Sequence, residues 1–439
     1  MIEIPKPSKI FFGWWIVLAT SLIGFFGTGF VSLGFSVLFK PIASELGLSR
    51  AVASMASSIQ SVGQGIWAPT GGWASDRYGP RRVMLLGIFC LALGCIMMNF
   101  ISSLWAFFVA WGLVIGAGFS LGCTIITDKA IVNWFVKRSG IAINTKFAIQ
   151  SLSGLLLLPL IAWLITTQGW RVTCIIAGVV IAVVSFPLVW FFVKPHPPEY
   201  YGFLPDGATI KGEAVGANQI IDKGANHASK AEVVGFTLRQ TMKTPAYWLI
   251  ISLGYISGLV MPVMGVHCIP FLTDMGINPV KAAAMMGLIT TVGIPARLVI
   301  GFIIDRVKTG HLRFIIVTGY LLQAIGVTTF LVSKSTAMIY VWFLLAGIGG
   351  AVSFGVQLPM FARYFGRKAY GSILGSWQMM NVPIGLVAPI YVGWVYDTTG
   401  SYMSIFGLLA PLLAVSGVVA CFILPPKPPA QISDVPRIV

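Results

Sequence analysis

Long apolar stretches recur along the whole chain and decide what it can fold into. The sequence is 57% hydrophobic and only 10% charged, so most of this apolar surface must face lipid. Only helices and closed barrels satisfy their backbone in lipid, and barrel strands are about ten residues long with alternating polarity. Twelve stretches of roughly 19 to 28 residues fit helices instead. The expected spans lie near 12–38, 52–75, 83–101, 104–132, 140–165, 171–193, 246–272, 282–304, 312–333, 337–362, 370–394 and 401–424.

The spans fall into two sets of six, which predicts an all-α membrane protein built from two six-helix halves. The expected N-terminal half is 1–193 and the C-terminal half is 246–424. Between them, 194–245 is rich in Gly, Ala, Lys and Asn, which predicts a cytoplasmic linker with one short surface helix around 231–243. The proline-rich segment 425–439 is expected to be a disordered cytoplasmic tail.

The net charge of +16 reflects membrane topology and does not require a nucleic-acid partner. Most Lys and Arg fall in the N-terminus, the even-to-odd loops, the linker and the tail, so the positive-inside rule places both termini in the cytoplasm. The segment Met1–Lys9 leads into a full-length span, so it is expected to precede a first helix and not to form a removable signal. A bacterial inner (plasma) membrane is the expected location.

Motifs for other chemistries are missing from the sequence. The six cysteines lie in apolar stretches without CxxC spacing, which is typical of small hydrophobic residues and not of a metal site. There is no Walker loop, His-Glu-x-x-His or Gly-x-Ser-x-Gly. We therefore expect no enzyme activity, no ATP drive and no cofactor.

A short motif occurs once in each half, in a polar break between spans. Segment 72–82 reads Gly-Trp-Ala-Ser-Asp-Arg-Tyr-Gly-Pro-Arg-Arg, and 301–310 reads Gly-Phe-Ile-Ile-Asp-Arg-Val-Lys-Thr-Gly. The shared frame is Gly-x-x-x-Asp-Arg, and an internal repeat of half the chain is typical of transporters. The glycine allows close helix approach. The predicted inner-gate residues are Asp76, Arg77, Asp305 and Arg306.

Further motifs give the chain a specific family resemblance. Trp-Phe-Val-Lys-Arg at 134–138 and Tyr-Phe-Gly-Arg-Lys at 364–368 precede the fifth and eleventh spans. With Phe-Gly-Trp-Trp at 12–15, the Pro-Glu and Leu-Pro-Asp-Gly pair within 198–207, and Gly-Ile-Pro-Ala-Arg at 293–297, the chain resembles the major facilitator superfamily. Within it, the chain is similar to the bacterial monocarboxylate transporter and oxalate/formate antiporter branch. The resemblance implies alternating access and a substrate carboxylate on the eighth-span arginine.

That arginine is Arg297, the leading candidate for substrate binding. It lies eight residues before Asp305, about 12 Å along the helix, which is too deep for easy snorkelling. Its sequence neighbours are apolar, and a permanently charged fork suits a carboxylate. The alternative is a structural arginine bonded to helix carbonyls. Proton-coupled animal members of the family have Asp where this chain has Gly293, and a first-span lysine for which Lys40 lies too late, which puts proton coupling through the eighth span in doubt.

The other charges at membrane depth suggest coupling or gating. Asp128, late in the fourth span, and Lys146, early in the fifth, are at similar depth and are expected to meet. They form either a structural ion pair or a gate or proton carrier. Lys129 points about 100° away from Asp128 and is expected to snorkel without a role. His267, near the outer end of the seventh span, is either a hydrogen-bonded interface residue or a proton or substrate contact.

Uncharged polar side chains near mid-span are candidates to complete a largely apolar cavity, although each is equally suited to interhelical hydrogen bonding. The candidates for substrate binding are Tyr255, Gln357, Asn381, Gln378, Thr28 and Gln150.

The sequence thus predicts a secondary transporter of a small organic anion, in the first instance a monocarboxylate, working as a monomer by proton symport or anion exchange. Two alternatives remain. One is an exporter of amphipathic drug-like compounds, and the other is a membrane sensor that binds a ligand without transporting it.

Overall fold

The computed structural model describes six stretches of the chain. They are residues 11–45, 50–201, 203–207, 235–262, 268–333 and 335–427. The tail predicted at 425–439 therefore lies largely outside the described residues, as do Met1–Lys9 and His267.

Helices of the first half form six rods, because each apolar stretch is long enough to satisfy its own backbone. The first rod continues past the expected end at residue 38 to Glu45, and the long helix α8 is broken at Gly169, where φ is 80°. The elements are α1 (Gly13–Gly27), η1 (Thr28–Leu33), α2 (Phe35–Glu45), α3 (Arg50–Tyr78), α4 (Pro80–Met97), η2 (Met98–Phe100), α5 (Leu104–Phe107), η3 (Phe108–Ile115), α6 (Gly116–Cys123), α7 (Ile125–Trp134), α8 (Ser139–Val180), η4 (Ile181–Ser185) and α9 (Phe186–Phe192).

The second half repeats this plan with six more rods within the described ranges. The linker contributes η5 (Pro198–Tyr201), η6 (Pro205–Gly207) and the five-residue α11 (Leu238–Met242), which falls inside the expected surface helix. The remaining elements are α12 (Pro245–Pro262), α13 (Cys268–Asp274), α14 (Pro279–Arg306), η8 (Thr309–His311), α15 (Leu312–Val332), α16 (Thr336–Phe365), α17 (Tyr370–Thr399) and α18 (Met403–Cys421).

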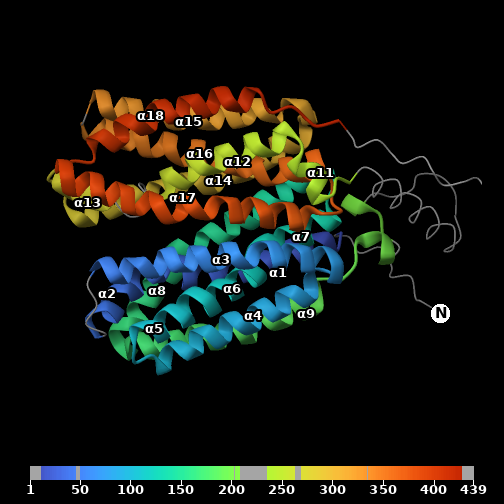
Figure 1. The fold of residues 1–439 in the computed structure, drawn as a ribbon, viewed down its shortest axis with the longest axis horizontal. Coiled ribbons are helices and arrows are strands. Elements are labelled where there is room, and N and C mark those ends of the chain that lie inside the picture. The colour runs from blue at the N-terminus through green and yellow to red at the C-terminus, as the bar shows by residue number, and fades with distance from the viewer. Residues whose placement is uncertain are drawn as a thin grey trace, which may run out of the picture.

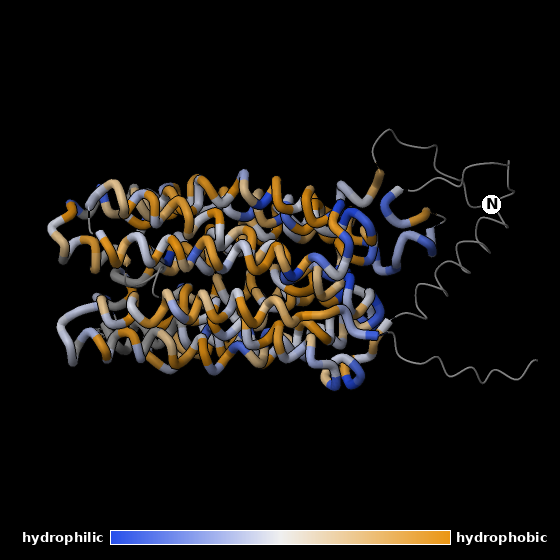
Figure 2. The backbone as a smooth tube through the Cα atoms, turned by 90° about the horizontal axis from the view of Figure 1, so that it is seen from above, coloured by the Kyte–Doolittle hydropathy of each residue, from blue (hydrophilic) through white to orange (hydrophobic). Residues whose placement is uncertain are grey.

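Two helix bundles lie side by side with their long axes parallel (Figure 1). Blue-to-green helices α1 to α9 form one bundle, and yellow-to-red helices α12 to α18 form the other. We call the end at which α1 begins and α18 ends the basic end. Hydrophilic segments gather at this end, while apolar residues cover the rest of the length (Figure 2). The fold is thus the predicted all-helical membrane architecture.

Within the described residues, eight helical segments are long and apolar enough to cross a membrane. Helix α3 is not one of them, since it carries many Ser, Gln and Gly residues. It packs along α17 of the other half, as α8 packs along α14. These helices therefore bury much of their surface against protein and not against lipid. The two pairs form the seams between the halves.

The end opposite the basic end carries a polar staple within the first half. Trp170 donates to Glu45 through Nε1, and Arg171 pairs with Glu45 at 2.9 Å. Arg171 also donates to the carbonyl oxygens of Asn99 and Ile101. The hydrogen bonds from Trp170 and Arg171 hold the pKa of the Glu45 carboxyl below its ordinary value. This staple keeps α2, α8 and the turn after α4 together.

Candidate functional site

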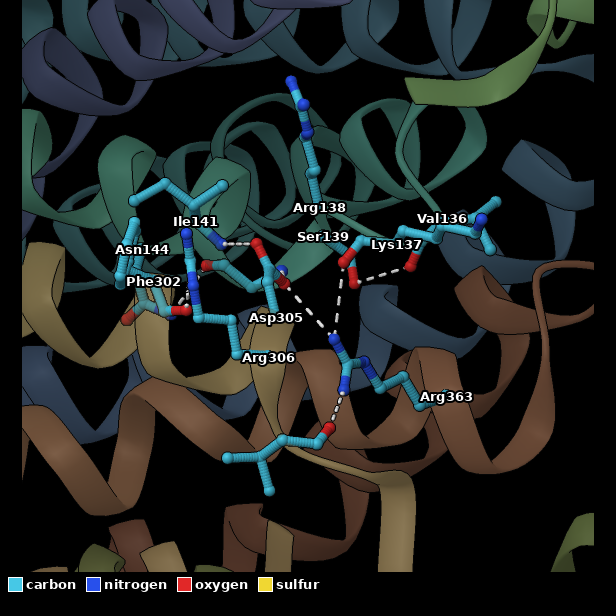
Figure 3. Close-up of polar contacts among 12 residues, drawn as sticks. Val136, Lys137, Arg138, Ser139, Ile141, Asn144, Phe302, Asp305, Arg306 and Arg363 are labelled. Atoms are coloured by element: carbon cyan, nitrogen blue, oxygen red, sulfur yellow. Dashed lines mark hydrogen bonds and ion pairs between the residues drawn. The ribbon is translucent and has the colours of Figure 1, made fainter. Parts of the chain in front are cut away.

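Each copy of the repeated motif places its aspartate on the N-terminus of a helix in the other half. Asp76, at the end of α3, accepts from the backbone N–H groups of Gly371 (3.1 Å) and Ser372 (2.7 Å) at the start of α17. Asp305, at the end of α14, accepts from the N–H groups of Gly140 (2.8 Å) and Ile141 (2.9 Å) at the start of α8 (Figure 3). A carboxylate there satisfies free donors and opposes the positive end of the helix dipole. The repeat therefore builds two equivalent latches, one on each seam.

Close backbone contact makes both latches possible. A Cβ atom added to Gly72 would collide with the carbonyl oxygen of Gly371, and one added to Gly140 would lie 2.9 Å from that of Gly301. Glycine at these positions lets the helices approach until the aspartate reaches the opposite backbone.

A basic side chain braces each aspartate. Lys129 Nζ lies 2.8 Å from Asp76 Oδ1 and also donates to the carbonyl oxygen of Arg367 across the seam. Arg363 pairs with Asp305 at 3.3 Å and donates to the carbonyl oxygens of Val307 and Lys137 (Figure 3). The expectation that Lys129 snorkels to lipid is wrong, because its side chain is only 6% exposed and points into this network.

The motif arginines do not take part in the latches. Arg77 lies over the rings of Trp73 (5.5 Å) and Tyr78 (5.7 Å). Arg306 lies over the Phe302 ring and donates to the carbonyl oxygen of the same residue (Figure 3). Within the described residues neither arginine is bonded to the other half, so of each Asp-Arg pair only the aspartate reaches across the seam.

The segment after α9 adds a third set of contacts. Glu199 in η5 forms an ion pair with Arg367 at 2.8 Å, and Arg367 donates to the carbonyl oxygen of Asn133 at 2.8 Å. Asp206 in η6 accepts from the N–H groups of Lys137 (2.8 Å) and Arg138 (2.9 Å), just before α8. Through Asp206, the linker thus holds the loop before α8. Through Glu199, it holds the loop before α17.

Arg297 lies deeper, beside two aromatic rings from opposite halves. Its guanidinium carbon is 5.6 Å from the ring centre of Phe147 on α8 and 5.8 Å from that of Phe354 on α16. The two rings meet edge to face at 5.5 Å. Buried atom Nη1 has no hydrogen-bond partner among the described residues. A buried donor of full charge without a partner is costly, so this position is suited to an anion.

The predicted contact between Asp128 and Lys146 is present. Lys146 Nζ lies 2.7 Å from Asp128 Oδ1, and the two side chains are 1% and 5% exposed, respectively. The same ammonium lies 4.4 Å from the ring centre of Phe147, whose ring also contacts Arg297. One ring therefore separates the ion pair from the candidate anion site.

Three of the predicted uncharged residues donate a side-chain hydrogen bond. Gln150 donates to Thr28, Gln357 to Tyr320 (3.3 Å), and Asn381 to the carbonyl oxygen of Trp377 (2.7 Å). Their side-chain oxygens are buried and unpartnered in the described part of the chain. Tyr255 and Gln378 are half-buried on α12 and α17. The open oxygens leave acceptors free for a ligand that donates hydrogen bonds.

Several residues of these networks were not predicted from the sequence. Arg363 and Arg367 flank or belong to the 364–368 motif, and Asp206 lies in the Leu-Pro-Asp-Gly segment, so motif membership was a usable signal for them. No sequence motif pointed to the contact between Phe147 and Phe354, because this contact depends on how the two halves pack together.

Comparison with known proteins supports the architecture. A family model described as Major Facilitator Superfamily matches residues 20–314 and 308–438. Monocarboxylate transporter 13 of Rattus norvegicus is 23% identical over 419 residues, covering 95% of this chain and 90% of that protein. The probable sulfoacetate transporter SauU of Cupriavidus necator is 23% identical over 406 residues, covering 89% of each. The crystal structure of the human organic anion transporter MFSD10 (TETRAN) is 15% identical with a TM-score of 0.67, covering 94% of this chain and 100% of that one, and shows the shared fold.

Proposed function

The chain belongs to the major facilitator superfamily of membrane transporters, and we propose that it carries a small organic anion, in the first instance a monocarboxylate, by alternating access. The names of the two relatives agree with an acid as substrate, since one is a monocarboxylate transporter and the other a probable sulfoacetate transporter. The proposal takes its site from this chain's own residues.

The position of Arg297 is the main support for this proposal. Its guanidinium lies at the junction of the halves, beside Phe147 and Phe354, with Nη1 buried and free of hydrogen bonds within the described residues. A carboxylate matches the planar fork of guanidinium and supplies the missing acceptor. The flanking rings exclude water and strengthen that charge-assisted bond. A site shared by both halves changes its access when the halves rock.

Further groups set the shape of the substrate. The free acceptor oxygens of Gln357 and Asn381 suit a hydroxyl or amino group elsewhere on the molecule. Gln150, Thr28, Tyr255 and Gln378 complete the proposed set. A short acid with an apolar body and one hydrogen-bond donor satisfies these features together.

The latches of Asp76 and Asp305 form the proposed inner gate. We assign the basic end to the cytoplasm from the distribution of Lys and Arg. The two carboxylate-capped seams then hold the cytoplasmic side closed, and opening requires both caps to separate. Arg77 and Arg306 have no part in this gate.

Energy for transport comes from a proton or from exchange against a second anion. Asp128 is the candidate proton carrier, since its ion pair with Lys146 lies one ring away from Arg297. A proton on Asp128 would release Lys146 and change the charge beside the bound anion.

The test is uptake of labelled lactate, pyruvate, acetate, formate, oxalate and larger aromatic acids into proteoliposomes. Wild type is compared with Arg297→Gln, with and without an inward proton gradient. The proposal expects uptake of at least one acid that Arg297→Gln abolishes. A response to the gradient identifies symport, and a requirement for internal anion identifies exchange. Acid uptake that is indifferent to Arg297→Gln overturns the carboxylate site.

The aromatic surroundings of Arg297 also support the second candidate, an exporter of amphipathic compounds. Phe147 and Phe354 offer stacking surfaces that need no carboxylate. In that case efflux of neutral aromatic compounds persists in Arg297→Gln and is lost in Phe147→Ala.

A further inference from the structure

A cavity of about 750 Å³ opens at the basic end between the two halves. Its walls come from the end of α3, the start of α4, the end of α9, the segment that follows it and the loop before α17. Asp76 and Lys129 of one latch line one wall of this cavity, whereas Arg297 does not line it. Its volume falls within the range of roughly 300–1,000 Å³ that small ligands occupy.

Basic residues dominate the walls. Arg77, Arg81 and Arg82 come from the first half, and Lys368 from the second. None of the four pairs with a carboxylate within the stretches that the structure describes. Four like charges facing one cavity repel one another unless something of opposite charge lies between them.

The acids in the cavity wall are already engaged. Asp76 is held by Lys129 and by the N-terminus of α17, and Glu199 is held by Arg367. The charge of the cavity therefore remains positive after its internal ion pairs are counted. The excess of Lys and Arg on one side of the membrane explains how many cations lie at the basic end. It does not explain why these four line the same cavity.

Aromatic side chains place the cavity at the membrane boundary. Arg81 lies 4.4 Å from the ring centre of Trp190, and Arg77 lies over Trp73 and Tyr78. These three rings are 51%, 50% and 47% exposed, respectively. Exposed Trp and Tyr are typical of the headgroup layer, so lipid phosphates and soluble phosphates can both reach this position.

We propose that this cavity binds a phosphate-bearing anion, which bridges Arg81 and Arg82 of the first half and Lys368 of the second and so stabilises the closed basic end. The oxygens of a phosphate are arranged tetrahedrally and reach donors on several sides, whereas the two oxygens of a carboxylate lie in one plane. Because one ligand contacts both halves, it binds the state in which they touch and shifts the population toward that state.

The experiment uses the full-length protein in nanodiscs and measures hydrogen exchange at the starts of α8 and α17. Nanodiscs of phosphatidylcholine alone are compared with nanodiscs containing phosphatidylglycerol, and with phosphatidylcholine nanodiscs given inorganic phosphate or pyrophosphate. Phosphatidylcholine is zwitterionic, so its own phosphate carries no net negative charge to the cavity. An anionic phosphate-bearing probe is expected to slow exchange at both helix starts relative to this baseline. Slowing by phosphatidylglycerol alone identifies a lipid headgroup, and slowing by the soluble probes identifies a free phosphate compound.

The test variant is Arg81→Gln/Arg82→Gln/Lys368→Gln, and the matched control is Arg239→Gln/Lys243→Gln/Lys308→Gln. The control removes three exposed cations at the same end that do not line the cavity. Each cation in the cavity is expected to contribute about fivefold in affinity, so the test variant loses roughly a hundredfold and the control keeps the wild-type response.

Equal loss in both triple variants, or no slowing in wild type by any probe, overturns the proposal. If the test variant does not fold, Lys368→Gln alone, which changes one exposed side chain, is expected to lose about fivefold. No transported substrate enters these measurements, so their outcome is independent of the organic-anion proposal.

Discussion

At the scale of single residues, Arg297 gives the most direct test. Arg297→Lys keeps a positive charge beside Phe147 and Phe354 but removes the planar fork proposed to hold both carboxylate oxygens. We expect uptake at low substrate concentration to fall at least about tenfold, mainly through a higher KM. Initial rates in proteoliposomes measure this. Arg313→Lys is the control, since Arg313 donates to the carbonyl oxygen of Cys421 away from the site. Full activity of Arg297→Lys would mean that charge alone suffices.

The buried pair of Asp128 and Lys146 gives a second prediction. Removing one partner leaves a buried charge uncompensated, so Asp128→Asn or Lys146→Met is expected to cost about 3–5 kcal/mol of stability. The double variant should recover most of that loss, because no buried charge remains. Thermal unfolding of the purified protein in detergent measures all three.

Transport by the stable double variant then separates the two roles of this pair. If the pair carries protons, uptake in the double variant no longer responds to a proton gradient. If the response is unchanged, the pair is structural. A double variant as unstable as the single variants would contradict the electrostatic explanation.

At the scale of elements, apolar length alone predicted most of the fold. Within the described residues, each expected span is a helix or a chain of helices, because a lipid-facing segment has no other way to satisfy its backbone. The helix ends were less predictable. The first rod runs to Glu45 because its polar end is stapled by Trp170 and Arg171, a contact between segments far apart in the sequence. Which helices pair across the halves could not be derived from apolar length.

The pairing of α3 with α17 can be tested at a glycine on their seam. A Cβ atom on Gly371 would lie 2.6 Å from the carbonyl oxygen of Gly72, whereas one on Gly350 in α16 meets nothing within 4 Å. Gly371→Ala is therefore expected to push α17 from α3 and cost about 1–3 kcal/mol, while Gly350→Ala is neutral or slightly stabilising. Thermal unfolding of both variants decides this. Equal stability of the two would contradict the close packing at this seam.

At the scale of the whole molecule, the internal repeat explains which residues of the proposed gate the sequence could point to. The duplicated Gly-x-x-x-Asp-Arg frame singled out Asp76 and Asp305, and each of them caps a helix of the other half. The same frame suggested Arg77 and Arg306, which the structure leaves outside the latches. Lys129 and Arg363 brace the aspartates from positions that are not equivalent in the two halves, so sequence comparison of the repeats does not pair them.

Two equivalent latches should act together. Each Asp→Asn change removes the charge and one acceptor from a helix cap, which costs about 1–2 kcal/mol. Either change alone leaves one seam latched. Asp76→Asn/Asp305→Asn weakens both and is expected to shift the equilibrium toward the state open at the basic end by roughly a hundredfold.

Distances between the halves measure this shift. Spin labels at exposed positions 138 and 308, in a background without the native cysteines, report one seam by pulsed electron paramagnetic resonance. Asp206→Asn is the matched control, because Asp206 accepts from the N–H groups before α8 but lies on the linker and does not join the halves. A longer distance in the double variant, small changes in the single variants and none in Asp206→Asn are expected. An unchanged distance in the double variant would mean that helix packing alone holds the basic end closed, and that the repeated aspartates serve another purpose.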